Sequence, residues 1–243
     1  MQLTSDTPIF RQIADRLKAR IAAGDLPPHD ALPSERVVAE HEQVSRMTAR
    51  RALETLEAEG LAYSKGRTGR FISPPRIDYN LASMSDFVAK AAKTGVEIDI
   101  TLQSSRLTTA NRAHATSLSI CTNTPIFENH RLFRHQGHAI FLETEYVVVD
   151  RCEEQVTNWP SLTPEERQNL RYSPLGHTAD IVIKMRPFSS SQAALLEVNP
   201  NQMGIAQEQV VRDKVGRPLC LSIQIWRGEL AQFTARALLS EYR

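Results

Sequence analysis

The sequence contains few cysteines and no long apolar run. Its three cysteines, Cys121, Cys152 and Cys220, are widely spaced and form no C-x-x-C pair. This pattern indicates reduced thiols of a cytosolic protein rather than a disulfide framework. No segment approaches the roughly 18 uninterrupted apolar residues of a membrane span, and the first residues, MQLTSDTPIF, lack the pattern of a secretion signal. We therefore expect a cytoplasmic protein with no membrane segment.

Motifs of common enzyme and metal sites are also missing. The chain has no G-x-S-x-G, H-E-x-x-H or Walker-type glycine loop. His130, His135 and His138 lie close in sequence, but strand alternation puts His130 and His135 on opposite faces, and no Cys or Asp completes a ligand set. Glu143 and Glu145 are two residues apart and so share one face, as a catalytic carboxylate pair would, but nothing else supports that role. We expect no metal, no cofactor and no catalytic residue.

What is present is an ordinary globular composition. The chain has 243 residues, 41% of them hydrophobic and 23% charged, enough for two domains. The formal net charge of +1 indicates no partner by itself, because a local basic patch can be hidden in a neutral total.

The N-terminal third shows helical periodicity. Ile9, Ile13, Leu17 and Ile21 follow i, i+4 spacing, which predicts a helix from Pro8 to Gly24. Ser34 is a good N-cap for a second helix, whose Val37 and Val38 should face a core, and Ser45 for a third, running to about Glu59. The third helix should bury one face, made of Ala49, Ala52, Leu53 and Leu56. Its other face should carry Arg46, Met47, Arg50, Arg51 and Glu54.

Two helices joined by a tight turn, the second with a basic outer face, are typical of a helix-turn-helix. In such units the start of the second helix enters the major groove, where arginine can bond a guanine edge and Thr48 could reach a phosphate or a thymine methyl. The alternative is a surface helix with solvated arginines. The next segment, LAYSKGRTGRFIS (61–73), favours DNA, because it predicts a two-stranded wing with Lys65, Arg67 and Arg70 near its tip.

The segment from LPSERVV to GRTGRFI resembles the DNA-binding module of the GntR family of bacterial transcription regulators. The resemblance implies a winged helix-turn-helix and places DNA contacts on Arg36, Ser45, Arg46, Thr48, Arg50 and Gly66. To these predicted DNA contacts we add the wing residues Lys65 and Arg67. We also add Arg51, which stands where the family often has a neutral residue. The wing is one residue longer than the family's G-x-G-T-F pattern.

The dipeptide Pro74–Pro75 marks a stiff connector. We predict a DNA-binding domain at residues 1–73, a linker at 74–79 and a second domain at 80–243. The second domain interleaves short helical segments with alternating strands, and HQGH and KVGRP read as hairpin turns. This pattern predicts an α+β fold with an antiparallel or mixed sheet.

The second domain resembles the UTRA ligand-sensing domain of the HutC subfamily, which has a chorismate-lyase-like fold. The segments that carry this resemblance are Phe87 to Leu102, HRLFRHQGHAIFLETEY and DKVGRPLCLSIQIWRGELAQF. The resemblance implies an effector pocket with an Arg-x-Arg pair, a glutamate and a helix N-terminus. The matching residues are Arg131, Phe133 in place of the second arginine, Glu143, Ser83 and Ser85, with Tyr146 on the same hairpin. Arg131 and Glu143 could alternatively form only a cross-strand ion pair.

Together these features predict a homodimeric repressor of a catabolic operon. Two winged helices would bind a palindromic operator of double-stranded DNA, and an effector would release them. The effectors that the resemblance implies are sugar phosphates, phosphonates and organic acids, which suggests an anion. The alternative is an enzyme, in which the chorismate-lyase-like domain retains lyase activity.

Overall fold

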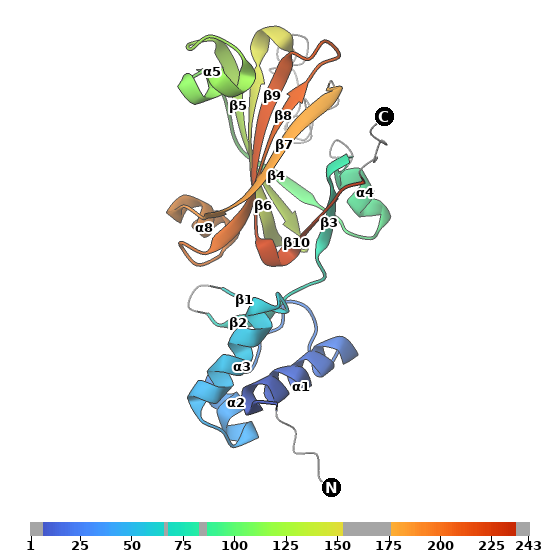
Figure 1. Ribbon diagram of the computed structural model, residues 1–243, viewed down its shortest axis with the longest axis vertical. Helices are drawn as coiled ribbons and strands as arrows, with labels where there is room; N and C mark the ends of the chain where they lie inside the picture. Colours follow the sequence, from blue (N-terminus) through green and yellow to red (C-terminus); the bar gives the residue numbers. More distant parts are fainter. Residues whose placement is uncertain (1–6, 66–67, 83–86, 153–175, 237–243) are drawn as a thin grey trace, which may run out of the picture. The chain divides into compact units, whose positions relative to one another are not determined.

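The computed structural model describes residues 7–65, 68–82, 87–152 and 176–236 (Figure 1). The chain forms two compact units, one made of residues up to Arg76 and the other mainly of residues from Ile77 onward. Among the described residues, no helix has the length and apolar character required to cross a bilayer.

The first unit is a small helical domain with a two-stranded wing. Its helices pack around Ile13, Leu53, Leu56 and Ile72, which are each at most 1% exposed. The wing strands pair in antiparallel fashion, and Ala31 forms an isolated bridge to Phe71 beside them. The elements are α1 (Ile9–Ala23), α2 (Glu35–Glu42), α3 (Arg46–Ala58), β1 (Ala62–Ser64) and β2 (Arg70–Ile72).

The predicted helix ends are confirmed by their capping geometry. Gly24 ends α1 in the left-handed conformation, with φ 83°. Ser34 and Ser45 cap α2 and α3 by accepting the backbone N–H groups of Val37 and Thr48. Only three residues separate α2 from α3, so the pair forms the predicted helix-turn-helix.

The prediction that Val37 and Val38 both face the core is wrong for Val37. Val38 is 5% exposed, whereas Val37 is 42% exposed. Successive helix positions are rotated by about 100°, so two adjacent side chains of a short surface helix do not both point at the same core.

The second unit is built on a six-stranded antiparallel sheet with strand order β4-β5-β6-β9-β8-β7. The predicted α+β class and antiparallel sheet are confirmed. The sheet strands are β4 (Asp99–Thr109), β5 (Pro125–His135), β6 (His138–Val148), β7 (Thr178–Pro187), β8 (Met203–Arg212) and β9 (Pro218–Trp226). The other elements are β3 (Ile77–Asn80), α4 (Phe87–Lys93), α5 (Arg112–Leu118), α8 (Ser190–Leu196), β10 (Ala231–Thr234) and the 3₁₀ helices η2 (Val149–Arg151) and η5 (Gly228–Leu230).

The HQGH segment forms the predicted hairpin between β5 and β6. His135 pairs with His138, leaving Gln136 and Gly137 as the turn, with φ 50° and 79°. Two consecutive positive φ values define the type I′ turn that fits the twist of a hairpin.

The predicted linker at 74–79 is shorter in the structure. Its last three residues begin β3, which runs parallel to β10, with Ile77 opposite Ala231. Ile77 and Tyr79 are buried and Asp78 is exposed, as in a strand with one face on a core. The sequence did not reveal this strand because its partner lies about 150 residues further along the chain.

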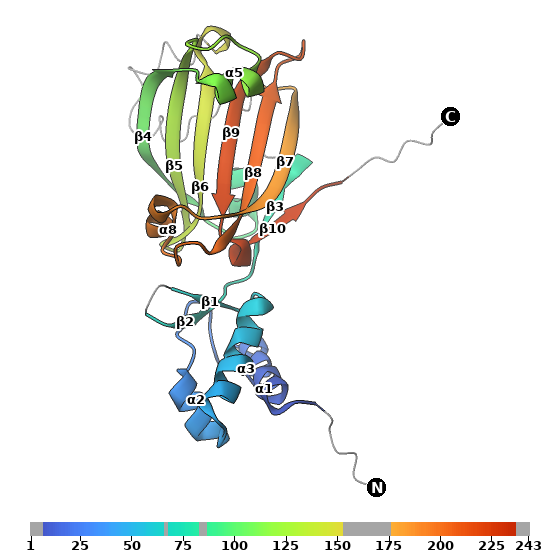
Figure 2. The same ribbon diagram turned by 60° about the vertical axis from the view of Figure 1, so that its left-hand side comes forward.

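Different elements cover the two faces of the sheet (Figures 1 and 2). The helices α5 and α8 pack on one face, which we call the helix side. β3, α4 and β10 cover part of the other face, which we call the strand side. Side chains alternate between the two faces along each strand, so the strand register assigns each candidate residue to one side.

Candidate DNA-binding and effector sites

The outer face of α3 carries the predicted DNA contacts. Arg46, Met47 and Arg50 are exposed, and Met47 is 63% exposed. The opposite face buries Ala49, Ala52, Leu53 and Leu56, as predicted, and holds the helix against α1 and α2. The helix therefore presents two arginines near its N-terminus to solvent, the arrangement that major-groove recognition by a helix-turn-helix requires.

Two of the arginines predicted to contact DNA, Arg50 of α3 and Arg36 of α2, form ion pairs within their own helices. Arg50 Nε donates to Glu54 Oε1 at 2.8 Å, and Arg36 Nη1 donates to both carboxylate oxygens of Glu40 at 2.8 and 2.9 Å. The hydrogen bond to Glu54 raises the pKa of Arg50 above its ordinary value. Exposed i, i+4 pairs contribute little to stability because solvent screens them, so a phosphate or base edge can replace the glutamate at small cost.

Ser45 and Thr48 fix the start of α3. Ser45 Oγ accepts the backbone N–H of Thr48 at 3.1 Å, and the two hydroxyls lie 2.9 Å apart. These predicted contacts thus also cap the helix.

The wing is attached to the helices by Arg70. Its Nη1 donates to Glu35 of α2 at 3.0 Å, and its Nε lies 3.1 Å from Glu57 of α3. Burial opposes the charged form of Arg70, but the two carboxylates outweigh it and raise its pKa. Lys65 is described at the wing, whereas Gly66 and Arg67 lie outside the described residues.

An open cleft of about 480 Å³ lies between the wing and the starts of α2 and α3. Arg36, Arg46 and Arg70 line it together with Glu35 and the N-cap Ser34. The cleft therefore joins the predicted contacts of α2 and α3 to the wing in one surface.

Arg51 is placed apart from Arg46 and Arg50. Its guanidinium lies 5.8 Å from the centre of the Phe10 ring on α1, a cation–π distance. The structure brings Arg36 and Arg46 together at the cleft and puts Arg51 beside α1, so it does not group Arg51 with the predicted base contacts.

The strand side of the sheet buries a band of polar side chains, which we call the polar band. Buried polar residues in a sheet core normally have hydrogen-bond partners and often a function. Its residues come from β5, β6, β8 and β9 and are at most 6% exposed: Asn129, Arg131, Glu143, Glu145, Gln207, Gln209, Ser222 and Gln224.

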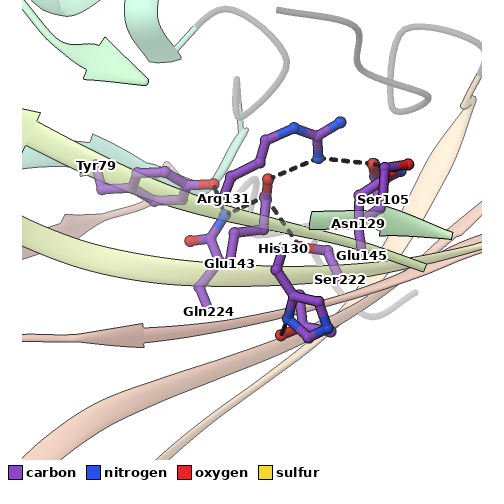
Figure 3. A network of polar contacts seen from close by, with 10 residues as sticks. Tyr79, Ser105, Asn129, His130, Arg131, Glu143, Glu145, Ser222 and Gln224 are labelled. Carbon is purple, nitrogen blue, oxygen red and sulfur yellow. Dashed lines mark hydrogen bonds and ion pairs between the residues drawn. The ribbon is translucent and has the colours of Figure 1, made fainter. Parts of the chain in front are cut away.

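Arg131 lies at the centre of this band and is fully buried. Its Nη1 donates to Glu145 at 2.9 Å and to Glu143 at 3.3 Å (Figure 3). The other oxygen of Glu143 accepts from Ser222 and from Gln224, each at 3.2 Å. The predicted proximity of Arg131 and Glu143 is thus present, within a network larger than a cross-strand pair.

The network continues at both ends of the band. Gln224 Nε2 also donates to the hydroxyl of Tyr79 at 3.2 Å, and Gln224 Oε1 accepts the indole N–H of Trp226 at 2.9 Å. At the other end, Asn129 lies 3.5 Å from Glu145 and accepts from Ser105 at 2.6 Å. Two carboxylates share one guanidinium here, and amide and hydroxyl groups bond these carboxylates in turn; such groups are the kind that orient a polar small molecule.

Phe133 belongs to the aromatic core beside the polar band. It stacks on Phe141 at 4.0 Å between ring centroids, and Phe141 stacks on Trp226 at 3.8 Å. Phe133 is only 2% exposed. The structure therefore brings Phe133 to the same face as Arg131 but uses its ring for packing.

Tyr146 lies on the helix side, away from the polar band. It is three positions after Glu143 on a regular stretch of β6, and its ring packs on His114 of α5 at 4.1 Å between centroids. An odd separation along a strand reverses the face, so the structure does not bring Tyr146 to Arg131. Ser83 and Ser85 lie outside the described residues.

Most of the polar band lies outside the predicted site residues. Glu145 is predicted only as half of a carboxylate pair, and the residues from β8 and β9 are not among the predictions. A signal was present: QEQ at 207–209 and SIQ at 222–224 place polar residues at alternate positions of strands that are otherwise apolar. Among the described residues, no group of three His, Cys, Asp or Glu side chains could hold a metal ion.

An exposed arginine-bearing helix-turn-helix with a wing, followed by a sheet domain with a buried polar band, defines a DNA-binding transcription regulator with a sensing domain. Family models agree. Residues 10–72 match the model of bacterial regulatory proteins of the gntR family, and residues 93–232 match the UTRA domain. The chain belongs to the UTRA-containing regulators of the GntR family.

Known relatives support this assignment. The chain is 25% identical over 215 residues to the mannosyl-D-glycerate transport/metabolism system repressor MngR of Escherichia coli, covering 86% of this chain and 85% of MngR. It is 40% identical over 92 residues to the transcriptional repressor NagR of Bacillus subtilis, but that match spans only 38% of either chain. PhnF from Mycobacterium smegmatis has the same fold, with a TM-score of 0.60 at 22% identity over 94% of this chain and all of PhnF. The architecture is that of a regulator and not of an enzyme.

Proposed function

We propose that this protein represses a catabolic operon by binding a palindromic operator as a homodimer, and that a small-molecule effector releases it. The proposed DNA-binding domain comprises residues 1–73 and the effector and dimerisation domain residues 80–243, with the linker at 74–79 shortened to 74–76 by β3. The relatives MngR and the histidine utilization repressor of Klebsiella aerogenes, 29% identical over 153 residues, carry names that describe repressors of metabolic systems. A repressor acts on the chromosome, so we place the protein in the cytoplasm.

The exposed arginines of α3 are the observation that carries this proposal. Arg46 and Arg50 are near the helix N-terminus, and Arg50 pairs with Glu54 at 2.8 Å. We assign base readout to these two arginines, and phosphate contacts to Arg36, Lys65 and the wing residues Gly66 and Arg67. Ser45 and Thr48 would contact phosphates while capping α3, and Arg51 would at most contact the backbone.

Fluorescence anisotropy with the DNA upstream of the gene tests the DNA-binding part. We expect Arg50→Ala to cost about 1–3 kcal/mol of specific binding. Glu54→Gln should bind as well as the wild type or more tightly, because it releases Arg50. Arg112→Ala, which removes the same charge from the exposed start of α5, is the matched control. An Arg50→Ala protein with wild-type operator affinity would remove Arg50 from the readout.

The polar band is the proposed effector site. Arg131 would supply the cation of the polar band for a phosphate, phosphonate or carboxylate group. Glu143, Glu145 and the glutamines favour a ligand that also carries hydroxyl or amide groups, as sugar phosphates and many organic acids do. We assign Arg131 and Glu143 to this site with Ser83 and Ser85, while Phe133 packs in the aromatic core beside it and Tyr146 lies on the helix side of the sheet.

Release of the operator requires the effector to bind the free arrangement of the protein more tightly than the operator-bound arrangement. A ligand with equal affinity for the operator-bound and free arrangements would shift neither. A thermal-shift screen of sugar phosphates, phosphonates and organic acids identifies the effector, because a ligand that binds the folded state raises the apparent stability. The same compound should weaken operator binding in the anisotropy assay. If every stabilising compound leaves operator binding unchanged, the proposed regulation is wrong.

A further inference from the structure

A large apolar side chain stands among the charged residues on the outer face of α3. Met47 is 63% exposed, whereas the residues of the buried face are at most 1% exposed: Ala49, Ala52, Leu53 and Leu56. Successive residues of a helix are rotated by about 100°, so Met47 points almost directly away from this buried face. The helix therefore directs a hydrophobic side chain into solvent.

The position of Met47 sets it apart from other exposed apolar residues. Such residues are common on protein surfaces and by themselves indicate no partner. Among the described residues of the first unit, Ile9 and Val37 are also large, apolar and exposed, but they lie on α1 and α2. Met47 lies in the first turn of α3, next to Arg46 and three residues before Arg50. The N-terminal residues of this helix are the ones that reach base edges in a helix-turn-helix.

The neighbours of Met47 satisfy their polar groups within the same helix. Arg50 Nε donates to Glu54 at 2.8 Å, and the hydroxyl of Thr48 lies 2.9 Å from that of Ser45. A thioether side chain needs no such partner, and its three rotatable bonds let it fit an irregular apolar surface. Met47 is thus suited to an apolar contact, while the arginines beside it are suited to polar ones.

The major groove offers one prominent apolar group, the C5-methyl group of thymine. The other base edges there carry hydrogen-bond donors and acceptors, which suit arginine. We propose that Met47 contacts a thymine methyl group and so selects thymine beside the bases read by Arg46 and Arg50. The inference rests on the operator binding in the proposed function and adds a third side chain to its base readout.

The geometry of α3 limits where this thymine lies. Four residues separate Arg46 from Arg50, which is about 6 Å along the helix axis. That length corresponds to roughly two base-pair steps of the duplex. Each half-site should therefore contain a thymine within about two base pairs of the bases that the arginines read. Burial of one methyl group corresponds to about fourfold in affinity.

Fluorescence anisotropy with two forms of the DNA upstream of the gene tests the contact. One form contains thymine, and the other is amplified with dUTP, so that uracil, which lacks only the methyl group, replaces each thymine. The wild-type protein should bind the uracil form at least about fourfold more weakly. Met47→Ala should bind the thymine form more weakly than the wild type does, and should bind both forms alike. Met47→Leu keeps an apolar side chain and should retain the preference for thymine.

Val215→Ala is the control for shortening an exposed side chain. This valine is 75% exposed in the β8–β9 turn of the second unit, so the variant should prefer thymine as the wild type does. Circular dichroism shows whether each variant is folded. Equal binding of both DNA forms by the wild type, or an undiminished thymine preference in folded Met47→Ala, would overturn the proposal. A wild-type protein that binds neither form would instead refute the operator binding of the proposed function.

Discussion

The two units of this protein bury different kinds of side chain. The core of the first unit is apolar, and its arginines and glutamates lie at or near the surface. All ten buried polar residues of the described chain belong to the second unit. The difference fits the sites proposed for the two units. DNA is read on an outer surface, so the first unit needs only a rigid support, whereas a small molecule is held by polar groups inside a domain.

The strongest test of this difference is Arg131→Ala. Removing a fully buried guanidinium leaves Glu143 and Glu145 without their cation, and breaking a buried ion pair in this way costs about 3–5 kcal/mol. Tryptophan fluorescence during urea unfolding reports on the second unit, because Trp159 and Trp226 both follow residue 77. Arg134→Ala, three residues further along β5 and only partly buried, should change stability by less than about 0.5 kcal/mol. A similar small loss for Arg131→Ala would mean that the band does not stabilise the fold.

The first unit should depend instead on apolar packing. Leu53 is 1% exposed between the helices, and Leu53→Ala should destabilise this unit by about 2–4 kcal/mol. Met47→Ala, on the exposed face of the same helix, should have little effect on stability. Helical circular dichroism during thermal unfolding measures both. Equal losses for the two variants would contradict the assignment of the faces of α3.

A smaller effect is expected at the start of the recognition helix. Ser45→Ala removes the cap of α3 and should cost about 1 kcal/mol of stability. Ser45→Asn retains a capping oxygen and should recover most of that loss. Thermal unfolding shows the difference; if Asn is no better than Ala, the hydroxyl does not act as a cap.

The smallest expected effect is a pH dependence on the helix side of the sheet. Burial alone would raise the pKa of Glu128, but hydrogen bonds from Arg106 at 2.7 Å and His130 at 3.0 Å outweigh it and lower the pKa below 4.5. A carboxylate whose pKa is lower in the folded state stabilises the protein above its unfolded pKa, and this contribution is lost as pH falls through the folded pKa. Glu128→Gln should therefore flatten the decline of stability below about pH 4.5. An unchanged decline would show that other carboxylates cause it.

Predictions from local sequence succeeded where one segment contains all the information. The caps at Ser34 and Ser45, the buried face of α3 and the HQGH hairpin each depend on residues within a few positions of one another. The position of Tyr146 on the opposite face from Arg131 follows from counting three positions from Glu143 along the strand. Helix geometry likewise indicates that Val37 and Val38 do not both face the core, but the local sequence does not show which of the two valines does.

Long-range pairing accounts for the features that local sequence does not predict. The strand β3 forms only because β10 lies beside it, and Phe133 is buried because Phe141 and Trp226 stack against it from two other strands. The polar band crosses strands in the order β5-β6-β9-β8, so Glu143 meets Ser222 and Gln224 about 80 residues away.

The amino-acid order alone therefore specified the helices, their caps, the exposed arginines and the hairpin strands, because periodicity and capping act over a few residues. The strand order decided which polar side chains share a buried network, which face holds Tyr146, and which strand is left at the edge. These features depend on contacts between segments far apart in the chain, and no local pattern records such contacts.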